Sequence, residues 1–134
     1  MHISTFAELV QAARDQLQPQ RLLFVFMVAE LPEGSNSEQR AAFDAGHGGV
    51  LVPLMAVDKA PEDLTTFAAL VEESRAAGPP WTLMFAAALS GSDGRPPSSA
   101  AVDAALQRMV DHLKSGSHAA FVPFNRDGHA VRLS

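Results

Sequence analysis

Six polar residues follow three apolar segments of the chain, namely Glu30, Asp58, Lys59, Ser90, Asp93 and Arg95. Carboxylates, an ammonium, a guanidinium and a hydroxyl can do acid–base work or bind a polar metabolite when they face one pocket. In open α/β sheets, ligands collect beyond the carboxyl ends of parallel strands. If the three segments are parallel strands, these residues form one ligand-binding edge. The alternative is that they are solvated charges, as most charges in loops are.

A glycine-rich segment, Gly46-His47-Gly48-Gly49, precedes the second of these apolar segments. Such a loop can point backbone N–H groups at an anion, so His47, Gly48 and Gly49 are candidates for an anion-binding loop. The sequence has no G-x-S-x-G to supply a nucleophile, and neither G-x-G-x-x-G nor a P-loop. The simpler interpretation is that Gly46 ends a helix and that the next glycines turn the chain into a strand.

The histidines could form a metal site only if residues that are distant in the sequence came together around one ion. Asp44 and His47 are three residues apart and could join His112, His118 or His129 around an ion. No H-x-x-x-H or H-E-x-x-H spacing occurs, so we predict surface histidines, no metal site and no cofactor. Cysteine is absent, which excludes disulfides, thiolate nucleophiles, cysteine-based zinc sites and iron–sulfur clusters.

Charge and hydropathy exclude two classes of partner. The net charge is −5, and the ten basic residues are scattered with no two adjacent, whereas nucleic-acid binding needs a clustered basic face. The longest apolar runs, Leu22–Ala29 and Trp81–Leu89, are too short to cross a bilayer, which takes about 20 residues. The N-terminus carries no signal-peptide pattern. We therefore expect a cytoplasmic protein that binds neither nucleic acid nor membrane.

Apolar periodicity and terminators predict nine elements in one α/β domain over residues 1–134. Four helices are expected, over 5–18, 35–45, 61–77 and 99–115, with a capping-box spacing at the start of the first two. Five strands are expected, over 22–29, 50–57, 81–89, 119–124 and 129–133. The fold class is therefore α/β, with helices packed on a mixed sheet of about five strands.

The order of these elements predicts parallel crossovers between the first three strands, followed by an antiparallel hairpin at Asp127-Gly128. Pro53 and Pro123 cannot donate a ladder hydrogen bond, which places their strands at sheet edges or puts a bulge at the proline. The alanines of the third strand suggest that a helix packs closely against it.

Five segments carry a resemblance to a known family: Gln20–Phe26, Glu30–Pro32, Val57–Lys59, Leu70–Ser74 and Ala88–Gly91. On these segments the whole chain resembles a family of short proteobacterial proteins of unknown function. Its members are often labelled ribonucleotide reductase subunit alpha. That activity needs a thiyl radical on a cysteine, and this chain has no cysteine and is too short for the ten-stranded barrel of such a subunit. We therefore exclude it, and the resemblance implies kinship only.

Two functions remain open at this stage. The first is a non-catalytic binding or protein-interaction module that self-associates as a dimer and takes a protein partner or a small polar metabolite, because no catalytic constellation is complete. The second is a small-molecule enzyme of the hydrolase or isomerase type that uses Glu30, Asp58, Lys59 and Arg95. The second requires these side chains to share one pocket.

Overall fold

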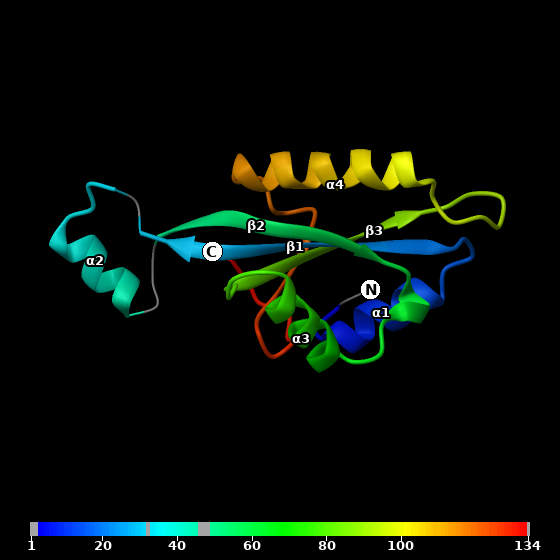
Figure 1. The fold of residues 1–134 in the computed structure, drawn as a ribbon, viewed down its shortest axis with the longest axis horizontal. Helices are drawn as coiled ribbons and strands as arrows, with labels where there is room; N and C mark the ends of the chain where they lie inside the picture. The colour runs from blue at the N-terminus through cyan, green and yellow to red at the C-terminus, as the bar shows by residue number, and fades with distance from the viewer. Residues whose placement is uncertain (1–2, 32, 46–48, 134) are drawn as a thin grey trace.

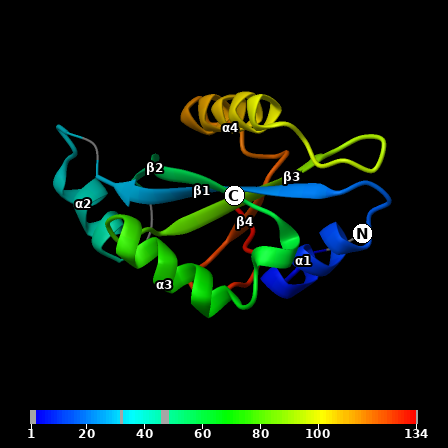
Figure 2. The same cartoon turned by 45° about the vertical axis from the view of Figure 1, so that its right-hand side comes forward.

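The computed structural model describes residues 3–31, 33–45 and 49–133, and its elements form three layers. A four-stranded sheet lies in the middle, with strand order β2-β1-β3-β4. Helices α1 and α3 cover one face and α4 covers the other, while α2 lies beyond one end of the sheet (Figures 1 and 2). The elements in chain order are α1 (Phe6–Arg14), β1 (Gln20–Glu30), α2 (Ser37–Asp44), β2 (Val50–Lys59), the 3-10 helix η1 (Pro61–Asp63), α3 (Phe67–Ala77), β3 (Leu83–Ser90), α4 (Ser99–Lys114) and β4 (Val122–Phe124).

Every strand pair in the sheet is antiparallel. The α/β class is confirmed, but the expected mixed sheet is wrong, because no two neighbouring strands are parallel. β1 is the central strand, and β2 and β3 flank it with both running in the opposite direction. The physical reason lies in the connections: α2 lies beyond one end of the sheet and β2 returns antiparallel to β1, whereas α3 passes beneath the sheet and β3 then runs parallel to β2, with β1 between them. The run of buried residues in β1 reflects coverage of both faces, which the sequence pattern alone cannot distinguish from a parallel strand.

Prolines mark both edges of the sheet, as the sequence predicts. β2 is an edge strand, and its pairing with β1 shifts register where Met55 and Pro53 face Phe26 and Met27. Leu54 is therefore the extra residue of a bulge, which lets the strand continue past a residue with no N–H. At the other edge, the carbonyl of Pro123 in β4 accepts a hydrogen bond from the N–H of Val131.

The helices begin at polar caps, close to the predicted positions. Thr5 caps α1 by accepting from the N–H of Glu8 at 3.2 Å. α2 starts one residue later than the predicted box, because Asn36 and Gln39 cap each other reciprocally. The expected helix from Pro61 is wrong at its start: Pro61 opens only η1, and α3 begins after the Thr66 cap.

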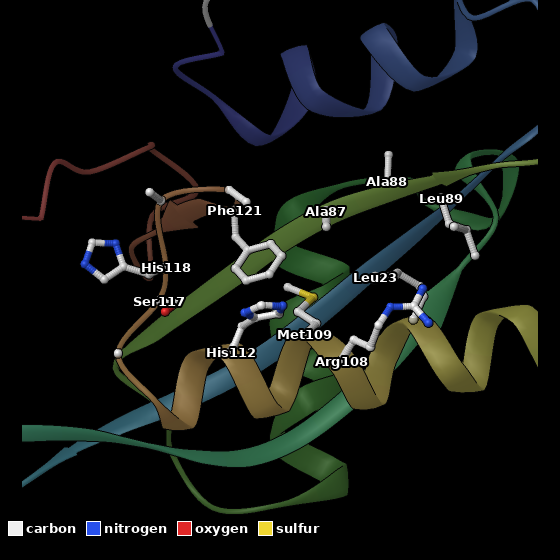
Figure 3. A pocket seen from close by; sticks show the side chains of 14 residues that line it. Leu23, Ala87, Ala88, Leu89, Arg108, Met109, His112, Ser117, His118 and Phe121 are labelled. Atoms are coloured by element: carbon white, nitrogen blue, oxygen red, sulfur yellow. The ribbon is translucent and has the colours of Figure 1, made fainter.

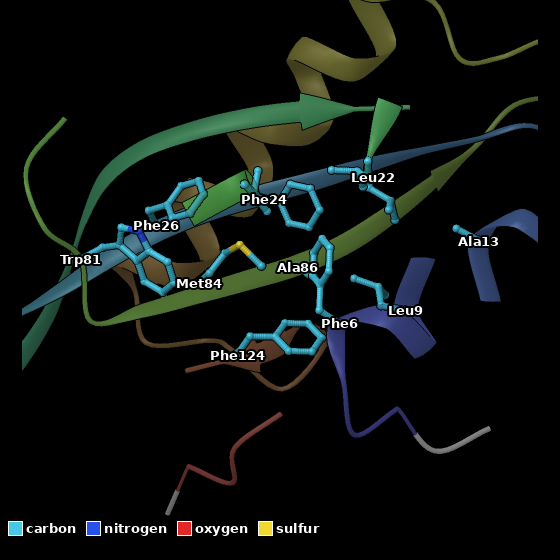
Figure 4. Packing of buried hydrophobic residues seen from close by; sticks show 12 residues of the cluster. Phe6, Leu9, Ala13, Leu22, Phe24, Phe26, Trp81, Met84, Ala86 and Phe124 are labelled. Atoms are coloured by element: carbon cyan, nitrogen blue, oxygen red, sulfur yellow. The ribbon is translucent and has the colours of Figure 1, made fainter. Parts of the chain in front are cut away.

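The face beneath α1 and α3 is packed with aromatic side chains (Figure 4). Phe24 of β1 lies 5.8 Å from Phe6 of α1 between ring centroids, and Phe26 lies 5.1 Å from Trp81. The indole N–H of Trp81 donates to the Ser74 hydroxyl of α3 at 2.9 Å, which satisfies a buried donor. Arg126 covers the outer side of that indole, 4.5 Å from its centroid. Packed side chains therefore fill this face from the sheet out to the surface of the molecule.

The opposite face is covered by α4 alone. Its buried residues Val102, Ala105, Met109 and Leu113 form one stripe along the helix, whose bounds are close to the predicted 99–115. They pack on Leu23, Val25 and Met27 of β1, and α4 lies mainly over β2 and β1. The half of this face formed by β3 therefore has no helix directly above it. The expectation that a helix packs closely on the β3 alanines is not met at Ala87.

The C-terminal segment turns where Asp127-Gly128 predicts, but it does not form a fifth strand. Gly128 takes a positive φ of 80°, and Asn125 and His129 join across the turn through an N–H to carbonyl bond of 3.0 Å. Beyond the turn, Ala130 makes an isolated bridge to Phe124 and donates its N–H to Ser4. Sharing the segment between β4 and the N-terminus prevents a continuous ladder with either.

Candidate functional site

The antiparallel sheet divides the polar residues that follow the strands. Lys59 pairs with Leu22 near the start of β1, whereas Glu30 ends β1 and pairs with Val50. Leu22 and Glu30 are eight steps apart along β1, which at about 3.4 Å per residue is about 27 Å. Glu30 therefore lies at the opposite end of the sheet from Asp58, Lys59 and Ser90. One pocket that uses all the predicted residues does not exist in this fold.

Asp58 and Lys59 also point to different faces, since neighbouring residues of a strand alternate. The Asp58 carboxylate accepts from Arg21 Nε at 2.6 Å, and both side chains are about one-third exposed (33% and 31%). Lys59 pairs with Glu73 of α3 on the other face. Each charge is thus engaged by a partner of opposite sign, which is the usual arrangement of a charge at the margin of a core.

The segment that holds Ser90, Asp93 and Arg95 contains a tight turn. Ser92 and Arg95 exchange both backbone hydrogen bonds, at 3.0 and 2.9 Å, and Asp93 and Gly94 have φ of 53° and 75°. This is the geometry that an Asp-Gly pair favours in a two-residue hairpin. The turn borders an open, polar cavity of about 640 Å³ in front of the α4 N-terminus. Asp93 and Arg95 are solvent-exposed, and the Ser98 hydroxyl already caps α4.

The candidate anion loop falls largely outside the described residues, which exclude His47 and Gly48. Gly49 is described and has a positive φ of 84°. A Cβ at this position would come within 2.9 Å of the Glu30 carbonyl oxygen and 2.8 Å of the Phe43 ring. Gly49 is therefore required by the close approach of the chain to the end of β1, which is a structural role.

A different feature of the fold is a cavity on the face of the sheet that α4 covers. It is a groove of about 690 Å³ between α4 and β3, closed at one end by the segment 116–121 (Figure 3). Apolar side chains form its walls: Leu23, Ala87, Leu89, Ala105, Met109 and Phe121. It exists because α4 lies over β1 and β2 while β3 presents the small side chain of Ala87 toward it. We call this cavity the α4–β3 groove.

Three basic or titratable side chains border the α4–β3 groove: Arg108 and His112 from α4, and His118 from the segment that follows (Figure 3). The rings of His112 and Phe121 lie 6.4 Å apart, and those of His118 and Phe85 lie 6.2 Å apart. None of the residues that border the groove is an aspartate or glutamate. The groove therefore combines an apolar interior with a border that holds one guanidinium and two imidazoles, in a chain whose net charge is −5.

Sequence reasoning missed the residues of this groove, although it predicted α4 itself. Arg108 and His112 stand on the polar side of the helix stripe, where the pattern shows only a solvated face. One signal is the run of alanines in β3, from which the sequence predicts close helix packing. Whether small residues accommodate a helix or leave a groove depends on where the helix axis crosses the sheet, and periodicity does not specify that.

Searches for other kinds of site and for relatives gave no positive result. Among residues 3–31, 33–45 and 49–133, no three His, Asp or Glu side chains gather as a metal site would require. No helix within those ranges has both the length and the hydropathy to span a membrane. No family model, curated protein or solved structure matches the chain. The α4–β3 groove is therefore the feature of this fold that best fits a ligand site.

Proposed function

We propose that this protein is a non-catalytic binding module and that its ligand site is the α4–β3 groove. The observation that carries the proposal is the groove itself: about 690 Å³, with apolar walls and a few polar groups at its border. Ligand sites are typically concave, mostly apolar and about 300–1,000 Å³ in volume, with a small number of polar groups that fix orientation. The α4–β3 groove has each of these properties.

The chemistry of the border specifies the class of ligand. Arg108 is permanently charged, and a guanidinium pairs well with a carboxylate or a similar anion. His112 adds a donor beside Arg108 on α4 and His118 adds one at the other end of the groove, and no acidic side chain borders the groove to compete for them. The groove therefore suits a ligand with an apolar body and an anionic group. A purely apolar ligand would leave the basic border unused.

The enzyme alternative lacks a comparable observation. It requires Glu30, Asp58, Lys59 and Arg95 to face one substrate, and Glu30 lies about 27 Å along the sheet from Lys59. Asp58 and Lys59 are already paired with Arg21 and Glu73. Hydrolase or isomerase activity therefore has no assembled set of groups among these four residues. For this reason we favour binding without catalysis.

A fluorescence titration with anilinonaphthalene sulfonate tests the proposal. This aromatic anion matches the proposed ligand class, and its emission rises in an apolar site. Ala87→Phe places a large side chain in the groove, whereas Ala69→Phe makes the same change at an exposed position of α3. We expect Ala87→Phe to weaken binding at least about tenfold and Ala69→Phe to leave it unchanged. Equal binding by both variants, or none by the parent protein, would contradict the proposal.

The charge of the border is tested separately. Arg108→Gln replaces the guanidinium with a shorter, neutral polar side chain, and Arg75→Gln is the same change on the other face of the molecule. We expect Arg108→Gln to weaken binding of the same probe about three- to tenfold, because one charge-assisted hydrogen bond contributes more than a neutral one. If the two variants bind alike, the anionic part of the proposed ligand class is wrong.

Self-association as a dimer and a cytoplasmic location stay predictions from the sequence. Light scattering of the purified protein measures the first directly. A monomer at all concentrations would remove the dimer and leave the groove proposal intact, because every residue that borders the groove comes from one chain.

A further inference from the structure

β3 is paired along only part of its outer side. On its inner side it pairs with β1 from Leu83 to Ser90. On its outer side β4 pairs only with Met84, Phe85 and Ala86. Among the described residues, no strand continues beside β3 from Ala87 to Ser90. This stretch borders the α4–β3 groove, so an open strand edge and an apolar groove meet at one place.

The ladder indicates which backbone groups of this stretch are free to pair. In an antiparallel pair, the N–H and C=O of one residue point to the same neighbour, and successive residues alternate. Gly91 donates its N–H to the Pro19 carbonyl at 2.8 Å, so its backbone groups face β1. Leu89 and Ala87 lie two and four residues before Gly91, so their backbone groups face β1 as well. Ala88 and Ser90 consequently direct their backbone groups outward.

The β4 end of the ladder gives the same alternation independently. The Pro123 carbonyl accepts from the Val131 N–H, so Pro123 faces away from β3. Its partner Phe85 must then face β1, which again places Ala86 and Ala88 on the outward side. Ala86 has Val122 of β4 opposite it, whereas Ala88 and Ser90 are solvent-exposed. Their N–H and C=O groups form a short ladder with a place for one more strand.

A strand added at this place would have alternate side chains over the α4–β3 groove. Ala87 and Leu89 point to the α4 face and border the groove, while Ala88 points to the other face (Figure 3). An added strand lies about 4.8 Å beyond β3, and its side chains alternate in the same way. Those on the α4 face would lie between Phe121 and the Arg108 side of α4. Arg108, His112 and His118 would then meet an acidic side chain or a terminal carboxylate.

We infer that the ligand of the α4–β3 groove is an extended peptide segment of a partner protein, added as a strand to the outer edge of β3 at Ala88 and Ser90. This inference rests on the proposed function and specifies its ligand as a polypeptide with an apolar residue and a carboxylate. In such strand addition, main-chain hydrogen bonds supply affinity and pockets for alternate side chains supply specificity. The structure has both parts side by side.

Peptides for the test come from a displayed library of short random sequences, selected on the full-length protein and then synthesised with a fluorescent label. Anisotropy titrations compare Ala88→Pro with Ala88→Val. The proline removes the N–H of Ala88, which the alternation of the ladder directs away from β1, and the valine keeps it. We expect the proline to weaken peptide binding about tenfold or more, because the loss of one ladder hydrogen bond costs about that factor in affinity. We expect the valine to change peptide binding less than about threefold, because it keeps the N–H.

The peptide provides a second, independent readout should Ala88→Pro fail to fold by circular dichroism. Methylating peptide amides one at a time should abolish binding at alternate positions and leave it unchanged at those between, because a strand pairs only every second residue with one neighbour. Loss at every position, or at none, would overturn strand addition.

The failure of this inference and that of the proposed function are distinguishable. If anilinonaphthalene sulfonate binds the groove but no selected peptide competes with it, strand addition is wrong and the groove remains a small-molecule site. If selected peptides bind without sensitivity to Ala88→Pro or to methylation, the peptide binds elsewhere and the inference is wrong. If neither the dye nor any peptide binds, the proposed function fails as well.

Discussion

The two faces of the sheet differ in how completely they are filled. On the face beneath α1 and α3, the cavity bordered by Phe26, Met55 and Leu70 has a volume of about 30 Å³. On the face beneath α4, the groove beside Ala87 has about 690 Å³. The same strands build both faces, so the difference comes from side-chain size and from where the helices lie.

The comparison shows how one sheet can serve stability on one side and binding on the other. The closed face gathers large rings, which bury the most area per residue and pack in tilted or edge-to-face pairs at 5.1 to 6.0 Å between centroids. The other face has aliphatic residues under one helix, and its uncovered strip lies at β3. A protein that has a sufficient core on one face can leave part of the other incomplete.

The largest expected effect is the loss of stability when a phenylalanine of each face is replaced by alanine. Phe24 is fully buried on the closed face, and Phe24→Ala should lower the free energy of unfolding by about 3–5 kcal/mol. Phe121 is half-buried at the groove, and Phe121→Ala should cost about 1 kcal/mol. Urea unfolding followed by Trp81 fluorescence measures both. Similar losses for the two variants would mean that the faces are equally packed.

The next prediction introduces a large side chain at each of two neighbouring alanines, one on each face of the sheet. Ala86 points into the closed face and is 1% exposed, whereas Ala87 points into the groove. Ala86→Phe should destabilise the fold by about 1–3 kcal/mol through overpacking, and Ala87→Phe should change stability by less than about 0.5 kcal/mol. Thermal unfolding of both variants is the measurement. A large loss for Ala87→Phe would show that the groove closes in solution.

The smallest expected effect concerns the charges at the end of the strands. Asp58→Asn removes the ion pair with Arg21, whose side chains are about one-third exposed, so stability should fall by less than about 1 kcal/mol. Binding of anilinonaphthalene sulfonate should not change, since neither residue borders the groove. If Asp58→Asn abolished binding, the site would lie at the strand ends after all, and the enzyme alternative would regain support.

Much of the fold follows from local patterns in the sequence, and the errors share one cause. The helices, the first three strands, the bulge at Pro53 and the turn before Gly128 depend on periodicity, proline and glycine, which act within a few residues. Strand direction depends on how distant segments pack, and the expected parallel order was wrong. The predicted site at Glu30, Asp58 and Lys59 depends on that order. In the antiparallel sheet Glu30 lies at the opposite end from Asp58 and Lys59, so the three residues do not form one site.

The α4–β3 groove could not be predicted for a related reason. Its walls come from α4, β3 and the segment 116–121, and its volume depends on the crossing of α4 over the sheet. The open ladder at Ala88 depends on β4 being only three residues long. The sequence showed the proline that weakens this strand, yet six residues were predicted to pair. The missing pairing is what leaves the edge free.

Amide NMR spectra recorded during a titration with anilinonaphthalene sulfonate test the central claim most directly, because they report on both faces at once. The account predicts shifts concentrated at Ala87, Leu89, Met109, His112 and Phe121, with the amides of Phe24, Leu70 and Trp81 moving little. Shifts centred on the α1 and α3 face, or spread evenly over the molecule, would contradict the assignment of binding to the α4–β3 groove.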